Sequence, residues 1–213
     1  NEKFAKVNVR TKVVLPEGAD PAKYSVETSG WNPNKQKLTA VRTSLAQMKY
    51  NNNQAEQEFV IQAPSLWSPE MPALYSAETR LYEGDKLKDI YTTPFGIRSI
   101  EIIPDKGFFL NGKRTVFKGV CNHHDLGPLG AAVNDAAIRR QIRILKDMGC
   151  NAIRTSHNMP APDLVKACDE MGMMLMAESF DEWNVAKCKN GYNLFFDECA
   201  EKDMVNLLPN FRN

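Results

Sequence analysis

The second half of the chain alternates strand-like and helix-like segments, and this alternation constrains the fold more than any other feature. Asn134 can cap a helix that begins at Asp135, and Gly149 suits the end of that helix. Apolar residues recur along it at helical spacing, at Ile138, Ile142, Leu145 and Met148. A second helix is predicted to open at Pro162 and to end at Gly172.

Strand-like runs surround these helices at Thr115–Val120, Asn151–Ser156 and Met173–Ala177, and a last helical pattern runs from about Asp197 to Leu208. The order β-α-β-α-β-α builds a parallel sheet. Three such units are too few to close an eight-stranded barrel, which needs about 250 residues. The chain begins without Met and stops where a fourth strand is due, so we expect it to be truncated at both ends.

The first hundred residues have the two-residue period of β-strands. The strand candidates are 7–14, 38–45, 58–61, 74–81 and 90–93. Turn signals such as Pro16-Glu17-Gly18, Asn32-Pro33-Asn34 and Gly84-Asp85 separate several of them. Short strands without helical patterns between them indicate a β-sandwich of immunoglobulin-like size.

Composition excludes some classes of partner. The net charge is +1, so no basic surface for nucleic acid is expected, and no apolar run approaches the roughly 20 residues that span a bilayer. Five cysteines lie in the second half without CxxC spacing. An odd number in apolar patterns favours buried, reduced thiols over a disulfide framework.

Titratable residues follow the predicted strands of the second half. His123 and His124 come after the first strand, His157 after the second, and Glu178 after the third, with Asp181 and Glu182 just beyond. The carboxyl ends of parallel strands are where α/β proteins place their chemistry. This edge of the sheet is therefore the predicted functional site.

Several motifs, in this order and spacing, resemble glycoside hydrolase family 2, which contains β-galactosidases, β-glucuronidases and β-mannosidases. They are W-x-P-x-x-P-x-L-Y at 67–75, G-[FI]-R at 96–98, F-x-L-N-G-x at 108–113, a G-V-N-x-H-E-D-like segment at 119–125, and N-x-x-R-x-S-H at 151–157. The fourth motif departs from the family pattern, with Cys121 at the usual Asn and His124 at the usual Glu.

The resemblance implies a multidomain β plus α/β fold. Residues 1–103 correspond to the immunoglobulin-like β-sandwich of the family. Residues 104–213 correspond to the first three βα units of its (β/α)₈ TIM barrel, truncated thereafter. The sugar-binding β-domain that comes first in the family is absent from this sequence.

The resemblance also implies a retaining glycosidase acting on β-galactosides or related β-glycosides. Such enzymes use two carboxyl groups about 5 Å apart. The family's acid/base glutamate lies in an Asn-Glu pair after the fourth barrel strand, and its nucleophile lies several strands later. Neither falls within this chain, so we expect the chain alone to be inactive. The alternative is a non-catalytic carbohydrate-binding or interaction module. A native chain that continues into a strand ending in Asn-Glu would favour the enzyme.

The predicted substrate-binding residues are His123, Arg154 and His157, which the resemblance implies, and Glu178 and Trp183, which follow the third strand. Arg154 would hold the charge of the nucleophile, or else form a structural ion pair, for which the acidic residues after the third strand offer a carboxylate. The two histidines would donate to sugar hydroxyls, or else bond to loop backbone. Trp183 would stack on a sugar ring, or else pack within its loop.

No cofactor is predicted. Some family galactosidases bind Mg²⁺ here through Glu-x-His, whereas this chain has Glu182-Trp183-Asn184 and lacks the histidine ligand, although oxygen ligands leave Mg²⁺ possible. The expected partner is a carbohydrate, without nucleic acid or membrane. Uncovered sheet edges also make a homo-oligomer possible. The substrate class alone suggests a periplasmic or secreted protein.

Overall fold

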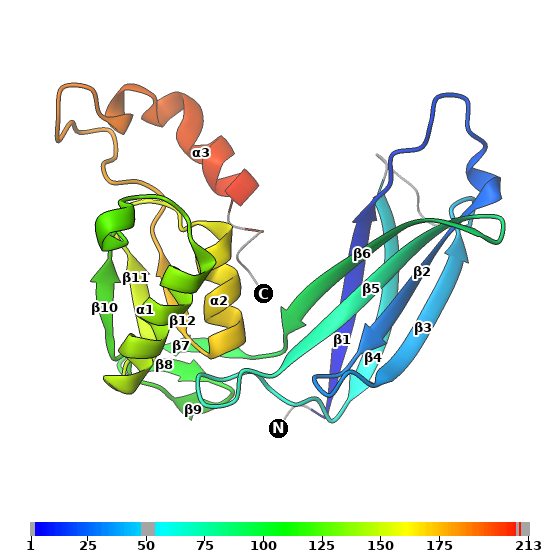
Figure 1. Cartoon of the computed structure of the whole chain (residues 1–213), viewed down its shortest axis with the longest axis horizontal. Coiled ribbons are helices and arrows are strands. Elements are labelled where there is room, and N and C mark those ends of the chain that lie inside the picture. The colour runs from blue at the N-terminus through cyan, green and yellow to red at the C-terminus, as the bar shows by residue number, and fades with distance from the viewer. Residues whose placement is uncertain (1–2, 48–53, 208, 210–213) are drawn as a thin grey trace. The chain divides into compact units, whose positions relative to one another are not determined.

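The computed structural model describes residues 3–47, 54–207 and 209, which form two compact units (Figure 1). The first unit comprises Asn1–Leu66 and Ala73–Arg98, and the second comprises Trp67–Pro72 and Ser99–Asn213. The fold class predicted from the sequence is confirmed, because the first unit is a β-sandwich and the second contains three βα units. The domain boundary after residue 103 stays a prediction.

The sandwich of the first unit consists of two antiparallel sheets (Figure 1). One pairs β1 (Phe4–Lys12) with β4 (Gln54–Gln62), from Phe4 opposite Gln62 to Lys12 opposite Gln54. The other has the order β3-β2-β5-β6, with bounds Lys37–Ser44, Tyr24–Trp31, Leu74–Glu83 and Lys86–Gly96. A short 3₁₀ turn, Pro21–Lys23, precedes β2.

Strand β4 shows why the alternating sequence forms a sandwich. Its buried and exposed residues alternate without a break. The inward residues are Ala55, Gln57, Phe59 and Ile61. Because side chains in a strand point to opposite faces in turn, one face enters the core and the other meets solvent.

The sequence patterns do not predict strand β2, although it is one of the two central strands of the larger sheet. Its buried residues include the polar Thr28 and Ser29, which are 0% and 2% exposed, and Thr28 points toward β4. The Thr28 hydroxyl donates to Gln57 Oε1 at 2.7 Å, and Gln57 Nε2 donates to the backbone oxygens of Val26 and Val41. A buried polar network of this kind is satisfied by tertiary partners, so it leaves no hydrophobic alternation to read.

The second unit begins with a small antiparallel sheet, β7 (Ile100–Ile103), β8 (Gly107–Leu110) and β9 (Lys113–Arg114). Asn111 and Gly112 connect β8 to β9 with φ values of 53° and 74°. Two successive positive φ values are the geometry that an Asn-Gly hairpin turn supplies. The hairpin expected from the F-x-L-N-G-x motif is therefore present.

The parallel sheet of this unit has the order β10-β11-β12, with bounds Gly119–Asn122, Ala152–Thr155 and Met174–Ala177. The 3₁₀ turn Gly127–Leu129 and helix α1 (Asp135–Asp147) follow β10, and α2 (Pro162–Met171) follows β11. After β12 come the 3₁₀ turn Tyr192–Leu194 and α3 (Phe196–Leu207). Residue Leu208 of the last predicted helix lies outside the described residues.

The core of the second unit lies between this sheet and its first two helices. It includes Ile142, Leu145, Ile153 and Cys168, with Val120 and Leu175 packed against them. Val120 pairs with Ile153, and Ile153 with Leu175, so one row of side chains across the sheet faces the helices. The residues on either side of this row in each strand point to the opposite face of the sheet.

Three sequence expectations need correction. Met148 is 68% exposed, because at 3.6 residues per turn it falls about 90° away from Ile138, Ile142 and Leu145. The strand predicted at Thr115–Val120 begins only at Gly119. Among the cysteines, Cys168 is buried, but Cys121 and Cys188 are exposed. Cys121 lies on the sheet face opposite the one that packs on α1 and α2.

The segment Trp67–Pro72 packs with the second unit, although its sequence neighbours on both sides belong to the sandwich. Trp67 is 4% exposed, and its Nε1 donates to the backbone oxygen of Asp169 at 2.8 Å. Lys146 Nζ donates to the oxygens of both Pro69 and Gly172. The tryptophan-proline motif is thus a structural element that fastens the ends of α1 and α2.

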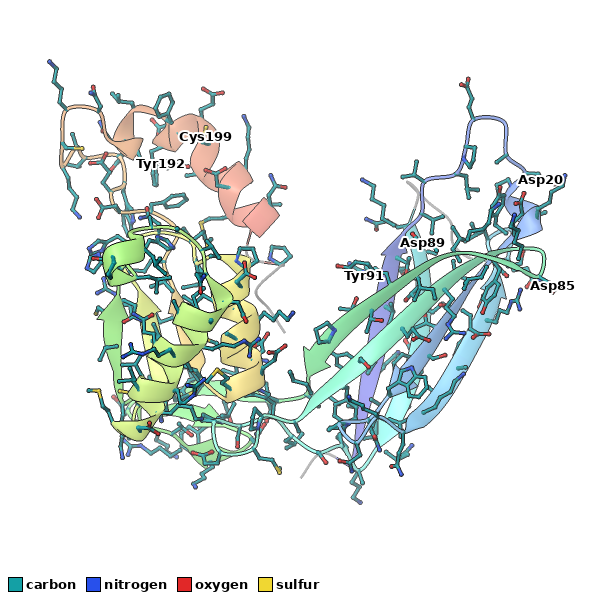
Figure 2. The ribbon with its side chains drawn as sticks, viewed as in Figure 1. Asp20, Asp85, Asp89, Tyr91, Tyr192 and Cys199 are labelled. Atoms are coloured by element: carbon teal, nitrogen blue, oxygen red, sulfur yellow. The ribbon has the colours of Figure 1, made fainter. Side chains whose placement is uncertain are left out.

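An open groove of about 390 Å³ lies within the sandwich, between β1 and strands β5 and β6. Asp89 and Tyr91 of β6 line it and are visible in Figure 2. The groove contains none of the predicted site residues. In the described part of the chain, no helix is long and apolar enough to cross a membrane.

Candidate functional site

The candidate site is built on the face of the parallel sheet that the helices leave free. Cys121 of β10 pairs with Arg154 of β11, and Arg154 pairs with Met176 of β12, so these three residues form one row across the sheet. The row lies one residue away from the apolar row that packs on the helices. Because strand side chains alternate, the Arg154 row must face away from the helices.

Arg154 occupies the middle of this row and joins two neighbouring strands. Its Nε donates to Glu178 Oε1, and its Nη1 donates to Cys121 Sγ at 3.2 Å. These two hydrogen bonds raise the pKa of Arg154 and, from the other side, the guanidinium lowers the pKa of the Cys121 thiol. The Arg154 side chain is 41% exposed. Its pairing with a nucleophilic glutamate stays a prediction.

The two predicted histidines come together at the ends of β10 and β11. The rings of His123 and His157 lie edge to face, with centroids 5.1 Å apart. His157 Nδ1 lies 3.4 Å from Glu178 Oε2 and 3.8 Å from Asp181 Oδ1. His157 therefore borders the carboxylates that follow β12, and His123 packs against the His157 ring. The peptide bond between Ser156 and His157 is cis.

The remaining predicted residue, Trp183, lies on the loop between β12 and α3. Its side chain is 70% exposed, which does not support the alternative that it packs within its loop. Two residues earlier, Asp181 accepts a hydrogen bond from Lys187 Nζ at 2.9 Å, and this bond holds the pKa of its carboxyl below the usual range. The loop therefore presents an aromatic ring next to an ion pair.

Glu182 lies between those two residues but points inward, with only 5% of its surface exposed. Its carboxylate accepts the backbone N–H groups of Lys187 at 2.5 Å and Asn193 at 3.1 Å, and these bonds lower its pKa. A Mg²⁺ ion at this position would need that carboxylate together with further oxygen ligands. Both of its oxygens are occupied by backbone, and no group of three His, Cys, Asp or Glu side chains able to hold a metal occurs in the described ranges. The residues present do not fit the ion.

Two members of the site were missed as functional candidates by the sequence analysis. The sequence predicts a buried thiol for Cys121 and no role for Lys187, whereas the structure places both in the site. The alternation of β10 carried a signal for Cys121, because Val120 and Asn122 flank it and Val120 belongs to the core row. No sequence signal marked Lys187, whose partner depends on how the loop folds back.

A small pocket of about 50 Å³ lies behind the loop that follows β10. His123 and His124 line it together with Leu126, Ile138 and Leu164. The last three are apolar and belong to, or pack against, the core between the sheet and the first two helices. His124, to which the family resemblance assigned no role, is part of it.

Comparison with known proteins places both units in one family. Residues 1–98 match the family described as "Glycosyl hydrolases family 2", and residues 101–205 match "Glycosyl hydrolases family 2, TIM barrel domain". The two matches follow each other in the order of the two predicted domains.

Individual relatives agree with these matches. The chain is 46% identical over 157 residues to the β-galactosidase BoGH2A of Bacteroides ovatus, covering 74% of this chain and 18% of that protein. It is 39% identical over 165 residues to a putative β-glucuronidase of Formosa agariphila, covering 78% of this chain and 16% of that protein. The chain thus spans less than a fifth of the length of either relative.

Solved structures show the same fold. A glycosyl hydrolase family 2 member from Bacteroides cellulosilyticus superposes with a TM-score of 0.82 at 34% identity, over 99% of this chain and 27% of that one. A β-glycosidase from Bacteroides vulgatus gives a TM-score of 0.82 at 35% identity, over 98% and 26%. On the strength of both units and their order, the chain belongs to glycoside hydrolase family 2.

Proposed function

We propose that these residues form part of a retaining β-glycosidase that acts on β-galactosides. The observation that carries the proposal is the cluster of His123, Arg154, His157 and Glu178 at the carboxyl ends of three adjacent parallel strands. Polar groups that converge at this end of a partial barrel are placed for catalysis or substrate binding. Family membership makes glycoside hydrolysis the chemistry that this placement serves.

The two carboxylates that break the glycosidic bond come, in this proposal, from polypeptide other than residues 1–213. Glu178 is not one of them, because it is committed to Arg154 and faces His157. What this chain supplies is the binding and orientation of the sugar. Holding the reacting groups in the right geometry accounts for a large part of enzymatic rate enhancement.

The histidines have distinct roles within that task. His157 Nδ1 faces the Glu178 carboxylate at 3.4 Å, so Nε2 of His157 is the ring nitrogen left to contact a sugar hydroxyl. The His123 ring lies edge to face against the His157 ring, and His123 contacts the neighbouring hydroxyl of the sugar.

Charge pairing supports a neutral sugar over a uronic acid. A glucuronide carries a carboxylate that needs a cationic partner. In the site, Arg154 is paired with Glu178 and Lys187 with Asp181. The relative at 46% identity is a β-galactosidase, although the one at 39% is a putative β-glucuronidase. We therefore infer a galactoside as the substrate.

Kinetics with two matched aryl glycosides test the proposal. The full-length protein should hydrolyse an aryl β-galactoside at least about tenfold faster, in kcat/KM, than the corresponding β-glucuronide. The anomeric product, followed by NMR at early times, should keep the β configuration. A preference for the glucuronide would overturn the substrate, and an inverted product would overturn the reaction type.

A further inference from the structure

The loop between β12 and α3 is wrapped around the carboxylate of Glu182. Residues on both sides of the loop donate to this one group, Lys187 through its N–H at 2.5 Å and Asn193 through its N–H at 3.1 Å. Gly191 passes so close that a Cβ there would lie 1.4 Å from Glu182 Oε1. Only a glycine can therefore occupy this position while the carboxylate stays where it is.

The same loop is closed at a second point by the side chain of Lys187. Its Nζ donates to Asp181 Oδ1 at 2.9 Å while its backbone N–H binds Glu182. Lys187 thus bridges two adjacent acidic residues, and Asp181 in turn lies 3.8 Å from His157 Nδ1. Two hydrogen bonds therefore link the Glu182 carboxylate through Lys187 to Asp181, the carboxylate that lies near the predicted sugar-binding histidine His157.

At the far side of the loop, an aromatic cluster anchors the turn that carries Asn193. The Tyr192 ring stacks on Phe180 with centroids 4.8 Å apart, and its hydroxyl donates to Asp203 Oδ2 at 2.5 Å. Tyr192 lies beside α3 (Figure 2), so the hydrogen bond to Asp203 ties the turn that carries Asn193 to this helix. The carboxylate of Glu182 joins this turn to the exposed part of the loop.

We propose that Glu182 is a positioning residue that holds Trp183 and the Asp181–Lys187 pair at the sugar site, in the place where a divalent cation would otherwise order the loop. The proposal rests on the function proposed above. It departs from metal-dependent glycosidases of the family, because the carboxylate that could have been a Mg²⁺ ligand is consumed by backbone N–H groups. In this proposal, hydrogen bonds within the protein order the loop between β12 and α3 without a metal ion.

If Glu182 positions this loop, removing its carboxylate should affect substrate binding more than the chemical step. Trp183 is exposed and adjacent in sequence to Glu182, so freeing the loop should weaken contacts that ground state and transition state share. Loss of such uniform binding raises KM and leaves kcat nearly unchanged. A residue that only supports folding would lower the fraction of active enzyme, and so kcat, without moving KM.

The test compares Glu182→Gln and Glu182→Ala with the matched control Glu198→Gln in the full-length protein. Glu198 lies on α3 with its side chain 77% exposed. We expect Glu182→Gln to raise KM for an aryl β-galactoside about tenfold with kcat within about threefold, and Glu182→Ala to raise it further. The control should match the wild type. Unchanged KM in both Glu182 variants would overturn the proposal, as would a loss confined to kcat.

Two further measurements do not depend on which glycoside is cleaved. Amide hydrogen exchange at Lys187 and Asn193 should accelerate at least about tenfold in Glu182→Ala but not in the control. For the wild type, EDTA should leave that exchange and the melting temperature unchanged, and added Mg²⁺ should not raise the melting temperature. Slow exchange in the variant, or a melting temperature that depends on Mg²⁺, would overturn the positioning role even if no activity were found. Failure to hydrolyse any glycoside, with fast exchange in the variant, would instead count against the proposed function alone.

Discussion

At the scale of single residues, Arg154 links the three strands on which the candidate site is built. It comes from the middle strand, donates to Cys121 on one side, and pairs with Glu178 just after the strand on the other. A planar guanidinium with five donors can hold both partners at once, which a lysine ammonium on a flexible stem does less well. The same rigidity would orient any further carboxylate brought to this face.

We expect Arg154→Ala and His157→Ala to impair the full-length enzyme at the chemical step. Both kcat and kcat/KM should fall about 100-fold or more, because these groups orient the sugar and nearby carboxylates in the transition state. Steady-state kinetics with an aryl β-galactoside measure the effect, and circular dichroism checks the fold. Arg143→Ala, at an exposed position on α1, should behave as the wild type. Normal kinetics in both site variants would remove these residues from the site.

Tyr192 predicts a pH dependence of stability at alkaline pH. Burial raises its pKa to about 12, and the hydrogen bond to Asp203 acts in the same direction. Between the unfolded value of about 10 and the folded value, the unfolded chain has lost this proton while the folded chain keeps it. Stability should therefore fall as pH rises from about 10 to about 12 and should not fall further, through this group, above that range.

Replacing Tyr192 by Phe removes this contribution. In urea unfolding followed by fluorescence, Tyr192→Phe should be less stable than wild type at pH 8, and the difference between them should shrink between pH 10 and pH 12. Tyr91→Phe, at a 72% exposed residue of β6, serves as the control (Figure 2). A constant difference across this pH range would show that the hydroxyl does not titrate as described.

At the scale of elements, helices α1 and α2 of the barrel unit are each followed by a glycine, and each glycine is required for a different reason. Gly149 follows α1 with φ of 87°, and a Cβ added there would meet no atom within 4 Å, so its role is conformational. Gly172 ends α2 with φ of 73°, and a Cβ there would also lie 2.3 Å from the Pro69 oxygen. The second glycine thus allows the Trp67–Pro72 segment to approach the helix.

This difference yields a matched pair of variants. Gly149→Ala should cost about 1 kcal/mol or slightly more through backbone strain alone. Gly172→Ala should cost clearly more, since the clash with backbone forces the Trp67–Pro72 segment away. Urea unfolding of both variants compares the two free energies. Equal losses would mean that the segment moves aside freely and does not fasten the helix.

At the scale of the whole molecule, the two compact units are interleaved in sequence. Trp67, within the stretch matched by the first family domain, is buried in the second unit and donates to Asp169. Another tryptophan, Trp31, lies at the end of strand β2 and so belongs to the sandwich. A division of the chain at one point between residues 98 and 104 would therefore separate Trp67 from the helix that it caps.

Tryptophan substitutions should reveal this interleaving. Trp67→Ala, at a buried site, is expected to destabilise the second unit by about 3–5 kcal/mol, with faster amide exchange in α2 and little change in β2. Trp31→Ala should instead accelerate amide exchange in the sandwich strands, with little change in α2. Faster exchange in β2 upon loss of Trp67 would show that this residue stabilises the sandwich as well.

The residue periods in the sequence were enough to predict a β-rich first unit and an alternating β-α second unit, with most of their elements in order. Alternation marked most sandwich strands, the Ile138–Ile142–Leu145 stripe marked α1, and Gly149 and Gly172 marked helix ends. These signals are local, because they depend on which face of one element is apolar. Strand β2 escaped since its buried Thr28 is satisfied by a partner that is distant in sequence, Gln57.

The contacts within the candidate site depended on tertiary structure more than the secondary-structure elements did. Sequence placed His123, His157 and Glu178 at strand ends, but the register of β10, β11 and β12 decided that Arg154 meets Cys121 and Glu178. Likewise, only the folded loop turned the Glu182 carboxylate inward, onto backbone N–H groups five and eleven residues away. Strand ends can be read from local patterns, whereas the partner of a charged side chain is chosen by the sheet register and loop closure that place it.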